Sequence, residues 1–123
     1  MDVAVNEFIN EEVLPMFVVV FEFVVRTGKE DEFKQAWRKT TQGIYLFKGS
    51  LGSRLHRDEE GRFIAYAQWP DRQSWERSGE IAMSGEYEQH RQAMHDALNL
   101  DTTRILFKLD VEADYLQSRP FAF

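Results

Sequence analysis

The sequence predicts an α+β protein with the ferredoxin-like βαββαβ order, in which one antiparallel sheet carries helices on a single face. Four stretches alternate, or are rich in β-branched and aromatic residues, as strands do, and two stretches between them repeat apolar residues at helical spacing. The strands are expected at 16–26, 51–57, 62–69 and 104–115, and the long helices at 28–48 and 86–98. The order strand, helix, strand, strand, helix, strand is that of the split βαβ unit.

Composition sets the broad class of protein. The chain has 123 residues, enough for one domain with a hydrophobic core, and it has no cysteine. Its formal net charge is −6 and its pI is about 5.1, which argues against nucleic acid or an anionic membrane surface as a partner. Residues 1–14 contain no Lys or Arg, unlike a signal peptide, and no apolar run reaches membrane-spanning length. We therefore expect a cytoplasmic protein.

Three segments are expected along the chain. Residues 1–15 are an N-terminal arm or a short helix that ends at Pro15, because their apolar residues recur at roughly helical spacing. Residues 16–115 form the ferredoxin-like domain, and residues 116–123 form a C-terminal tail.

The first strand is the strongest strand signal, and only Glu22 interrupts its apolar run. Thr27 and Glu30 stand three residues apart, as in a capping box, and are expected to open the first helix. Its apolar face consists of Phe33, Ala36, Trp37, Thr40, Ile44 and Phe47. Residues 58–61 predict a hairpin turn between the second and third strands.

The stretch from Arg62 to Trp75 holds the third strand and a short helix behind it. Pro70 ends the strand, and Asp71 is expected to cap a helix that brings Trp75 round to the strand end, beside Trp69. The two tryptophans either wall an apolar pocket or close a corner of the core.

Alternation assigns the strand residues to two faces. The second long helix is capped by Ser84 and presents Tyr87, His90 or Arg91, Met94 and Leu98 on one face. The odd strand positions, expected beneath the helices, are Phe17, Val19, Phe21, Phe23, Leu51, Leu55, Phe63, Ala65, Ala67, Ile105, Phe107 and Leu109. The even positions mix apolar and polar residues, and a second copy of the chain would cover them, so we expect a homodimer.

The chain resembles the antibiotic biosynthesis monooxygenase domain family in three segments, which are FVVVFEFVVRTGKEDEFKQAW, GSLGSRLHRD and FIAYAQWPDRQSWE. The resemblance extends over about Phe17 to Val111. It implies a dimeric α+β barrel of ferredoxin-like subunits. For some members it also implies oxidation of a small aromatic, polyketide- or quinol-like metabolite by molecular oxygen, with no metal or flavin cofactor.

Oxygenation without a cofactor requires an apolar pocket, a base, and donors that hold the substrate anion. Near the expected pocket corner the chain has residues of these types. The candidate substrate-binding walls are Trp37, Trp69, Trp75 and Met94, and the candidate catalytic residues are Tyr87 as donor, His90 or His95 as base, and Arg91 as anion clamp.

Two other functions stay open. An asparagine on the first strand is important in the haem-degrading and anthrone-oxidising branches of the family, and no residue from Phe17 to Arg26 is asparagine. This departure favours a non-catalytic, dimeric small-molecule-binding or stress-response module. The weaker alternative is haem degradation, for which Trp75 matches a tryptophan of that branch and His90 reaches the axial position only with an insertion around 79–85.

No metal site is expected, because His90 and His95 lie five residues apart and His56 lies on a strand. Glu22 is expected to be a structural ion-pair member and not the catalytic base, since a carboxylate buried in a strand must be paired. The residues on its parity that are expected to pair with it are Arg54, His56 and Lys108.

Overall fold

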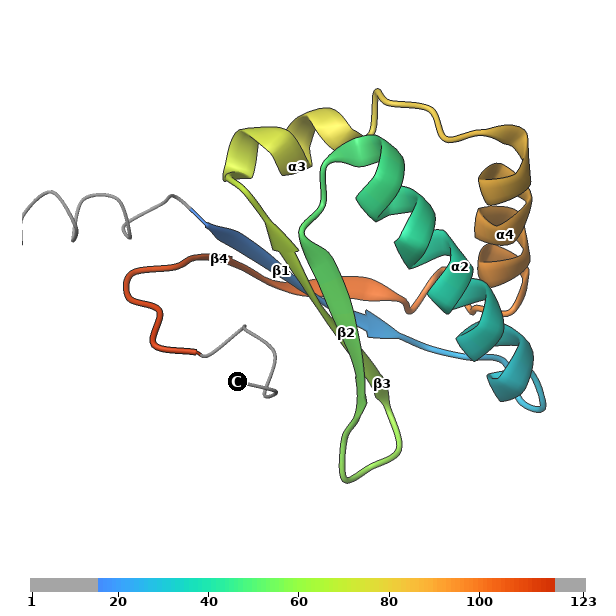
Figure 1. Ribbon diagram of the computed structural model, residues 1–123. Coiled ribbons are helices and arrows are strands. Elements are labelled where there is room, and N and C mark those ends of the chain that lie inside the picture. The colour runs from blue at the N-terminus through green and yellow to red at the C-terminus, as the bar shows by residue number, and fades with distance from the viewer. Residues whose placement is uncertain (1–15, 117–123) are drawn as a thin grey trace, which may run out of the picture.

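The computed structural model describes residues 16–116, which form one antiparallel sheet with helices packed on one of its faces (Figure 1). The elements are β1 (Phe17–Phe23), α2 (Glu30–Lys48), β2 (Gly52–Arg57), β3 (Phe63–Trp69), α3 (Arg72–Ser78), α4 (Gly85–Asp96) and β4 (Arg104–Asp110). The strand order across the sheet is β2-β3-β1-β4, so the predicted ferredoxin-like fold is confirmed. The short helix considered for residues 1–15, and the tail after Leu116, lie outside the described residues.

Local signals fix several element boundaries. The Asp71 side chain accepts the backbone N–H of Ser74 at 2.6 Å, as an N-cap should, and this hydrogen bond holds the pKa of the Asp71 carboxyl below its ordinary value. In the predicted turn, Asp58 accepts the backbone N–H groups of Glu60 and Arg62, and Gly61 has φ 85°. Both predictions are confirmed.

The capping box predicted at Thr27 is wrong. Helix α2 begins at Glu30, and its N-cap residue is Lys29, which makes no side-chain capping bond. A turn occupies the predicted start instead, since the Lys29 N–H donates to the carbonyl of Arg26 and Gly28 has φ 81°.

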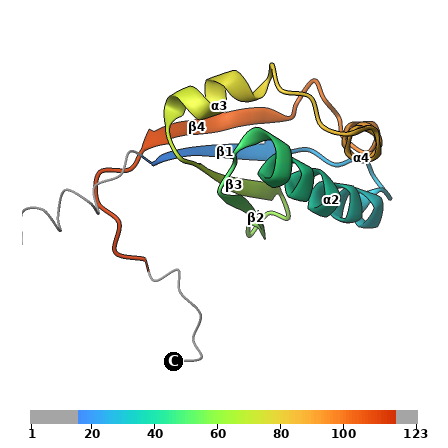
Figure 2. The ribbon, with the colours of Figure 1, turned by 45° about the horizontal axis from the view of Figure 1, so that its top comes forward.

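The helices divide the covered face between them. Figure 2 shows α2 beside β3 and β2, with α4 next to it, and α3 beside β4. Under α2 and α4, Phe33 packs against Phe63 with ring centroids 5.2 Å apart and is fully buried. Under α3, the Trp75 ring lies 5.5 Å from the ring of Phe17. The apolar odd positions of β1 and β3 thus form the core, as predicted.

Strand β4 breaks the predicted alternation. Val20 pairs with Phe107, but Phe21 pairs with Ile105, so a bulge shifts the register between these two pairs. Because residues that pair across two strands share a face, Phe107 and Leu109 lie with Val20 and Val18 on the side of the sheet away from the helices. The prediction that Phe107 and Leu109 lie beneath the helices is therefore wrong. We call their side of the sheet the open face, and the other side the helix-covered face.

The same bulge moves Lys108 to the helix-covered face, where it pairs with Val19 and its Nζ lies 5.7 Å from the centroid of the Trp75 ring. Strand β4 also ends at Asp110, earlier than the predicted Tyr115. Beyond it, Leu116 lies near Tyr66 and Gln68 of the open face.

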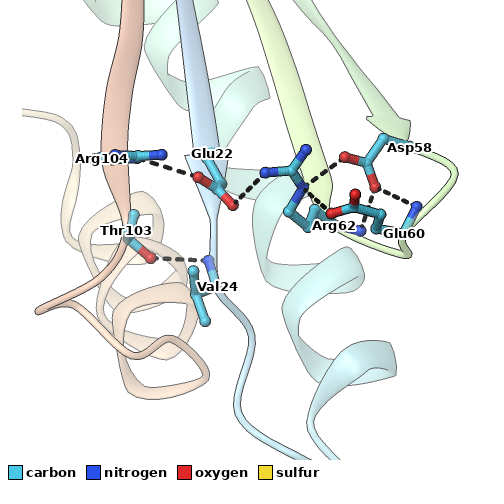
Figure 3. Close-up of polar contacts among 7 residues, drawn as sticks. All are labelled: Glu22, Val24, Asp58, Glu60, Arg62, Thr103 and Arg104. Carbon is cyan, nitrogen blue, oxygen red and sulfur yellow. Dashed lines mark hydrogen bonds and ion pairs between the residues drawn. The ribbon is translucent and has the colours of Figure 1, made fainter.

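Glu22 is held on the open face by two arginines (Figure 3). It is 7% exposed, its Oε1 accepts Nε–H of Arg104 at 3.2 Å, and its Oε2 lies 3.6 Å from an Nη of Arg62. The predicted ion-pair role is confirmed, but the predicted partners are wrong. Glu22 pairs with Arg104 in the shifted register, and Arg62 follows the hairpin turn, where it also binds Asp58 at 2.6 Å.

Candidate functional site

A cavity of about 160 Å³ lies between α2 and the helix-covered face, and we call it the inner cavity. It is lined by Phe21, Phe23, Trp37, Thr40, Thr41, Ile44, Ser50, Ser53, Ala65, Ala67, Trp69 and Met94. Ala65 and Ala67 are odd positions of β3, and their short side chains leave space between the sheet and α2. A β-branched residue at either position would fill part of it.

The polar groups of the inner cavity differ in whether they are satisfied. The Ser53 hydroxyl donates to the carbonyl of Tyr66 at 3.1 Å, and the Ser50 hydroxyl accepts the N–H of Gly52 at 2.9 Å. In contrast, Oγ1 of Thr40 and Nε1 of Trp69 are buried without a hydrogen-bond partner in the described part of the chain. Both of these residues are more than nine-tenths buried.

Two unpartnered donors on one small cavity are unusual. A helical threonine commonly bonds the carbonyl four residues earlier, yet Thr40 does not do so, and an indole N–H buried in a core normally finds an acceptor. Each unsatisfied group costs about 1–3 kcal/mol of stability. Residues that line the cavity thus hold hydrogen-bonding capacity that the described residues do not use, but both atoms are covered by their neighbours, so a ligand reaches them only if the side chain turns towards the cavity.

A surface groove of about 560 Å³, which we call the outer groove, lies next to the inner cavity. The residues that line both are Trp37, Thr41 and Ser53, so these three stand between the two spaces, and we call them the mouth. Beyond the mouth, the groove includes Arg38, Lys39, Gln42 and Tyr45. None of the side chains lining the inner cavity itself is ionisable, as far as residues 16–116 go.

The structure brings three of the four predicted wall residues together. Trp37, Trp69 and Met94 all line the inner cavity. Trp75 is not among the lining residues, because its ring lies over Phe17 on the α3 side of the core.

The predicted catalytic residues lie on α4, away from the inner cavity. The Tyr87 ring packs edge-on against Phe47 at 5.6 Å and covers Gly43 of α2. His90 lines a shallow groove between α2 and α4, with its Nε2 3.9 Å from Glu86. Arg91 lies 3.5 Å from Glu88. These three residues do not line the inner cavity.

Basic groups gather where the end of α2 meets α4. Partial burial, and then the positive charge of Arg91, lower the pKa of His95 from its ordinary value. The same two causes, in the same order, lower the pKa of Lys48. His95, the other candidate base, does not line the inner cavity either.

Sequence reasoning did not assign Thr40 to the site, although a signal was present. Thr40 lies on the apolar stripe of α2, between Ala36 and Ile44, where a hydroxyl has no solvent to bond. A polar residue inside an apolar stripe is the pattern that could have identified it. The serines at 50 and 53 gave no such signal, since loops and edge strands commonly carry serine.

Within residues 16–116, no cluster of three or more His, Asp or Glu side chains is placed to hold a metal ion. No helix in this range has the length and apolar character needed to cross a bilayer.

Comparison with known proteins places this geometry in context. The sequence pattern of the family "antibiotic biosynthesis monooxygenase" matches residues 16–94. No curated protein sequence matches the chain.

Solved structures with a similar fold include SnoaB, a cofactor-independent oxygenase from Streptomyces nogalater. It is 18% identical with a TM-score of 0.57, and the match covers 85% of this chain and 99% of SnoaB. A conserved protein from Methanosarcina mazei Go1 is 15% identical with a TM-score of 0.61, covering 81% of this chain and 96% of its own. Rv0793 from Mycobacterium tuberculosis is 12% identical with a TM-score of 0.61, covering 82% and 99%. At these identities the likeness concerns the fold.

Proposed function

Because the chain belongs to the antibiotic biosynthesis monooxygenase family, we propose that it is a cofactor-independent monooxygenase that oxidises a small aromatic, phenol- or quinol-like metabolite with molecular oxygen. One observation carries the proposal. The inner cavity has apolar walls, and two of the residues that line it, Trp69 and Thr40, carry buried donors without a partner in the described part of the chain. An aromatic ring with an oxygen substituent complements such a cavity, because the ring fills the apolar space and the oxygen accepts from a donor.

The chemistry follows from the electron richness of a phenolate. Its ring carbon para to the oxygen donates electrons to dioxygen, and a C–O bond forms there. The resulting hydroperoxide loses water as the O–O bond breaks and the hydrogen on that carbon leaves as a proton. One phenol and one dioxygen thus give one quinone and one water, with no other reductant.

In this proposal the protein stabilises the anion and excludes water. When substrate binds, the side chains of Trp69 and Thr40 turn their unpartnered donors to the phenolate oxygen in a setting of low dielectric, where a hydrogen bond to an anion is strongest. Trp37 and Met94 form apolar walls. Since no ionisable side chain of the described residues lines the cavity, the phenol proton leaves through the mouth to water in the outer groove.

The roles of Tyr87, His90 and Arg91 stay predictions. Their positions outside the inner cavity mean that a direct role would require the substrate to extend towards the groove between α2 and α4. Tyr87→Phe, His90→Gln and Arg91→Gln test this. Loss of turnover in any of them, with unchanged melting temperature, would assign that residue to the reaction and place the substrate partly outside the inner cavity.

A second function, a non-catalytic binding module of the same fold, is favoured by one observation. The inner cavity has no ionisable side chain among its lining residues, so the described structure offers no base there. Such a module would bind the aromatic molecule without consuming oxygen. Oxygen uptake therefore separates the two functions.

Haem does not fit the inner cavity. A volume of about 160 Å³ is far below what a porphyrin needs, and neither His90 nor His95 lines it. We derive no step through haem.

The test uses the purified chain, a panel of phenols and quinols, and an oxygen electrode. Trp69→Phe keeps a ring but removes the donor, so it should lower turnover by about 10-fold or more, in line with the loss of an anion-stabilising donor. Trp75→Phe is the matched control, because Trp75 does not line the inner cavity, and its turnover should stay near that of the parent. Tight binding of a phenol with no oxygen uptake would favour the binding module and reject the monooxygenase.

We also propose that the chain is a homodimer that buries its open face. The bulge places Phe107 and Leu109 on that face, where they are 58% and 44% exposed. Large apolar side chains exposed on an edge strand are typical of interfaces. Ultracentrifugation should give twice the 14.5 kDa of the chain, and Phe107→Asp should return it to the monomer. A parent protein that sediments as a monomer at micromolar concentration would reject the dimer.

A further inference from the structure

We infer that the inner cavity takes an aromatic molecule of a single ring, and not a fused two- or three-ring system. The inference rests on the proposed function and specifies its substrate class. It comes from the volume of the cavity, the position of its unpartnered donors and the residues that form its mouth.

The volume of the inner cavity sets the first limit. At about 160 Å³ it is close to an apolar cavity of about 150 Å³ that binds benzene in another protein. Sites for drug-sized ligands measure roughly 300–1,000 Å³. One six-membered ring with an oxygen substituent therefore fills the space, and a second fused ring would overlap the walls.

The walls cannot retreat easily. The sheet side of the cavity is formed by Ala65 and Ala67 of β3, which pair with Phe21 and Val19 in the middle of the sheet. Ala65 is 1% exposed. Its strand, β3, is hydrogen-bonded to β2 on one side and to β1 on the other, so the backbone at Ala65 is fixed in place. Packed interiors resist added volume, and the cost appears as lost affinity.

The donors orient the ring. Thr40 and Trp69 are among the most buried residues of the cavity, whereas Trp37, Thr41 and Ser53 form the mouth. A ligand oxygen that accepts from Nε1 of Trp69 or Oγ1 of Thr40 therefore lies at the inner end. Any further substituent has to leave through the mouth into the outer groove. The substrate class is thus a single-ring phenol that keeps hydrogen on the carbon para to the bound oxygen, as the proposed step requires, with any substituents at positions that can extend towards the mouth.

The experiment measures the binding of phenol, 2-naphthol and 2-anthrol by calorimetry under nitrogen, so that no ligand is oxidised. In a site without a size limit, each added ring would tighten binding, because it buries more apolar surface. A single-ring cavity reverses the order, and we expect naphthol to bind roughly 10-fold or more weakly than phenol. Trp69→Phe and Thr40→Val, which each remove a donor, should weaken phenol binding by roughly 3- to 10-fold.

Two variants change the volume in opposite directions. Ile44→Ala enlarges the cavity and should raise the affinity for naphthol relative to phenol, while Ala67→Val fills it and should abolish phenol binding. Thermal melting checks that each variant is folded, and Ile44→Val replaces Ile44→Ala if the latter unfolds, with a smaller shift in the same direction.

The outcomes separate the two proposals. Naphthol or anthrol binding as tightly as phenol, or an Ile44 variant without effect on ring preference, overturns the single-ring inference and leaves the proposed function standing. If no phenol of any size binds, both fail. Phenol binding that follows the expected order in the parent and in the variants supports both.

Discussion

The helix-covered face and the open face of the sheet differ in which side chains they bury and which they leave exposed. The helix-covered face buries aromatic and small side chains and leaves one small cavity, and two of the residues that line it carry unused donors. The open face satisfies its buried carboxylate, Glu22, with two arginines and exposes Phe107 and Leu109. On the helix-covered face the buried donors of Thr40 and Trp69 stay unpaired in the described part of the chain. On the open face the charge is neutralised and the apolar side chains are unpaired, as in a surface that meets another protein.

The comparison predicts that truncating an aromatic residue costs far more on the helix-covered face. Phe33→Ala removes a fully buried ring that lies between Phe23 and Phe63 at a tilt to both, and should lower the free energy of unfolding by about 3–5 kcal/mol. Phe107→Ala, the control, should cost less than about 1 kcal/mol at concentrations where the chain is monomeric, since the ring is mostly exposed. Urea unfolding measures both. Equal losses would mean that the two faces are buried alike.

A smaller effect is expected where the helices above the covered face touch. A Cβ on Gly43 would lie 2.7 Å from Cδ1 of Tyr87 and 2.9 Å from the sulfur of Met83. Overpacking lowers the free energy of unfolding by about 1–3 kcal/mol, and the better helix propensity of alanine offsets about 1 kcal/mol of that loss. Gly43→Ala should therefore destabilise the protein by about 1 kcal/mol. Gly85→Ala meets no atom within 4 Å and should be neutral or stabilising. A stabilised Gly43→Ala variant would show that α2 and α4 have room to separate.

On the open face, Glu22→Gln leaves Arg62 and Arg104 without their shared carboxylate. Because both arginine side chains are about half exposed or more, the loss should be limited to about 1 kcal/mol and should shrink in 1 M salt. Glu59→Gln, at an exposed position, is the control. Turnover per folded protein should not change, since Glu22 lies across the sheet from the inner cavity. A collapse of turnover at unchanged melting temperature would move the site to the open face.

The smallest predicted effect is a pH dependence from the helix layer. Burial and Arg91 lower the pKa of His95 in the folded chain, although Asp96 and Glu88 act in the opposite sense. The unfolded chain therefore binds the proton more readily, so this group reduces stability as pH falls below the ordinary pKa of 6.5 and has no effect well above it. In His95→Gln the loss of stability on acidification should be smaller than in the parent or in His56→Gln. Identical pH profiles of the three proteins would contradict the prediction.

Much of the fold followed from local pattern. In β3 the alternation of Phe63, Ala65, Ala67 and Trp69 with the residues between them predicted both the strand and the face that the helices cover. In the structure these four residues are buried and the residues between them are half-buried. Asp71 and the turn at Asp58 were also readable, because a cap or a turn is made by side chains a few residues apart. The prediction at Thr27 was wrong for the same reason. The spacing of Thr27 and Glu30 matched a capping box, but a turn with Gly28 in the left-handed region precedes the helix, which begins only at Glu30.

The site was only partly readable. The sequence named Trp37, Trp69 and Met94 as walls, which the structure brings together, because large apolar residues on helix and strand faces mark what packs inside. It also grouped Trp75 with them, because Trp75 lies close to Trp69 along the chain. In the structure α3 places the Trp75 ring against Phe17 instead, so proximity along the chain was a poor guide. Whether a hydroxyl such as that of Thr40 is satisfied depends on atoms from other elements.

The sequence by itself determined the order of strands and helices, the covered faces of β1 and β3 and the need to pair Glu22, since these depend on alternation, spacing and the cost of burying charge. Only the tertiary structure decided the faces of β4, the partners of Glu22 and the volume of the inner cavity. A single bulge opposite Val20 and Phe21 reverses the side on which Phe107, Leu109 and Lys108 lie. A bulge is a property of the pairing between two strands, so neither strand alone reveals it.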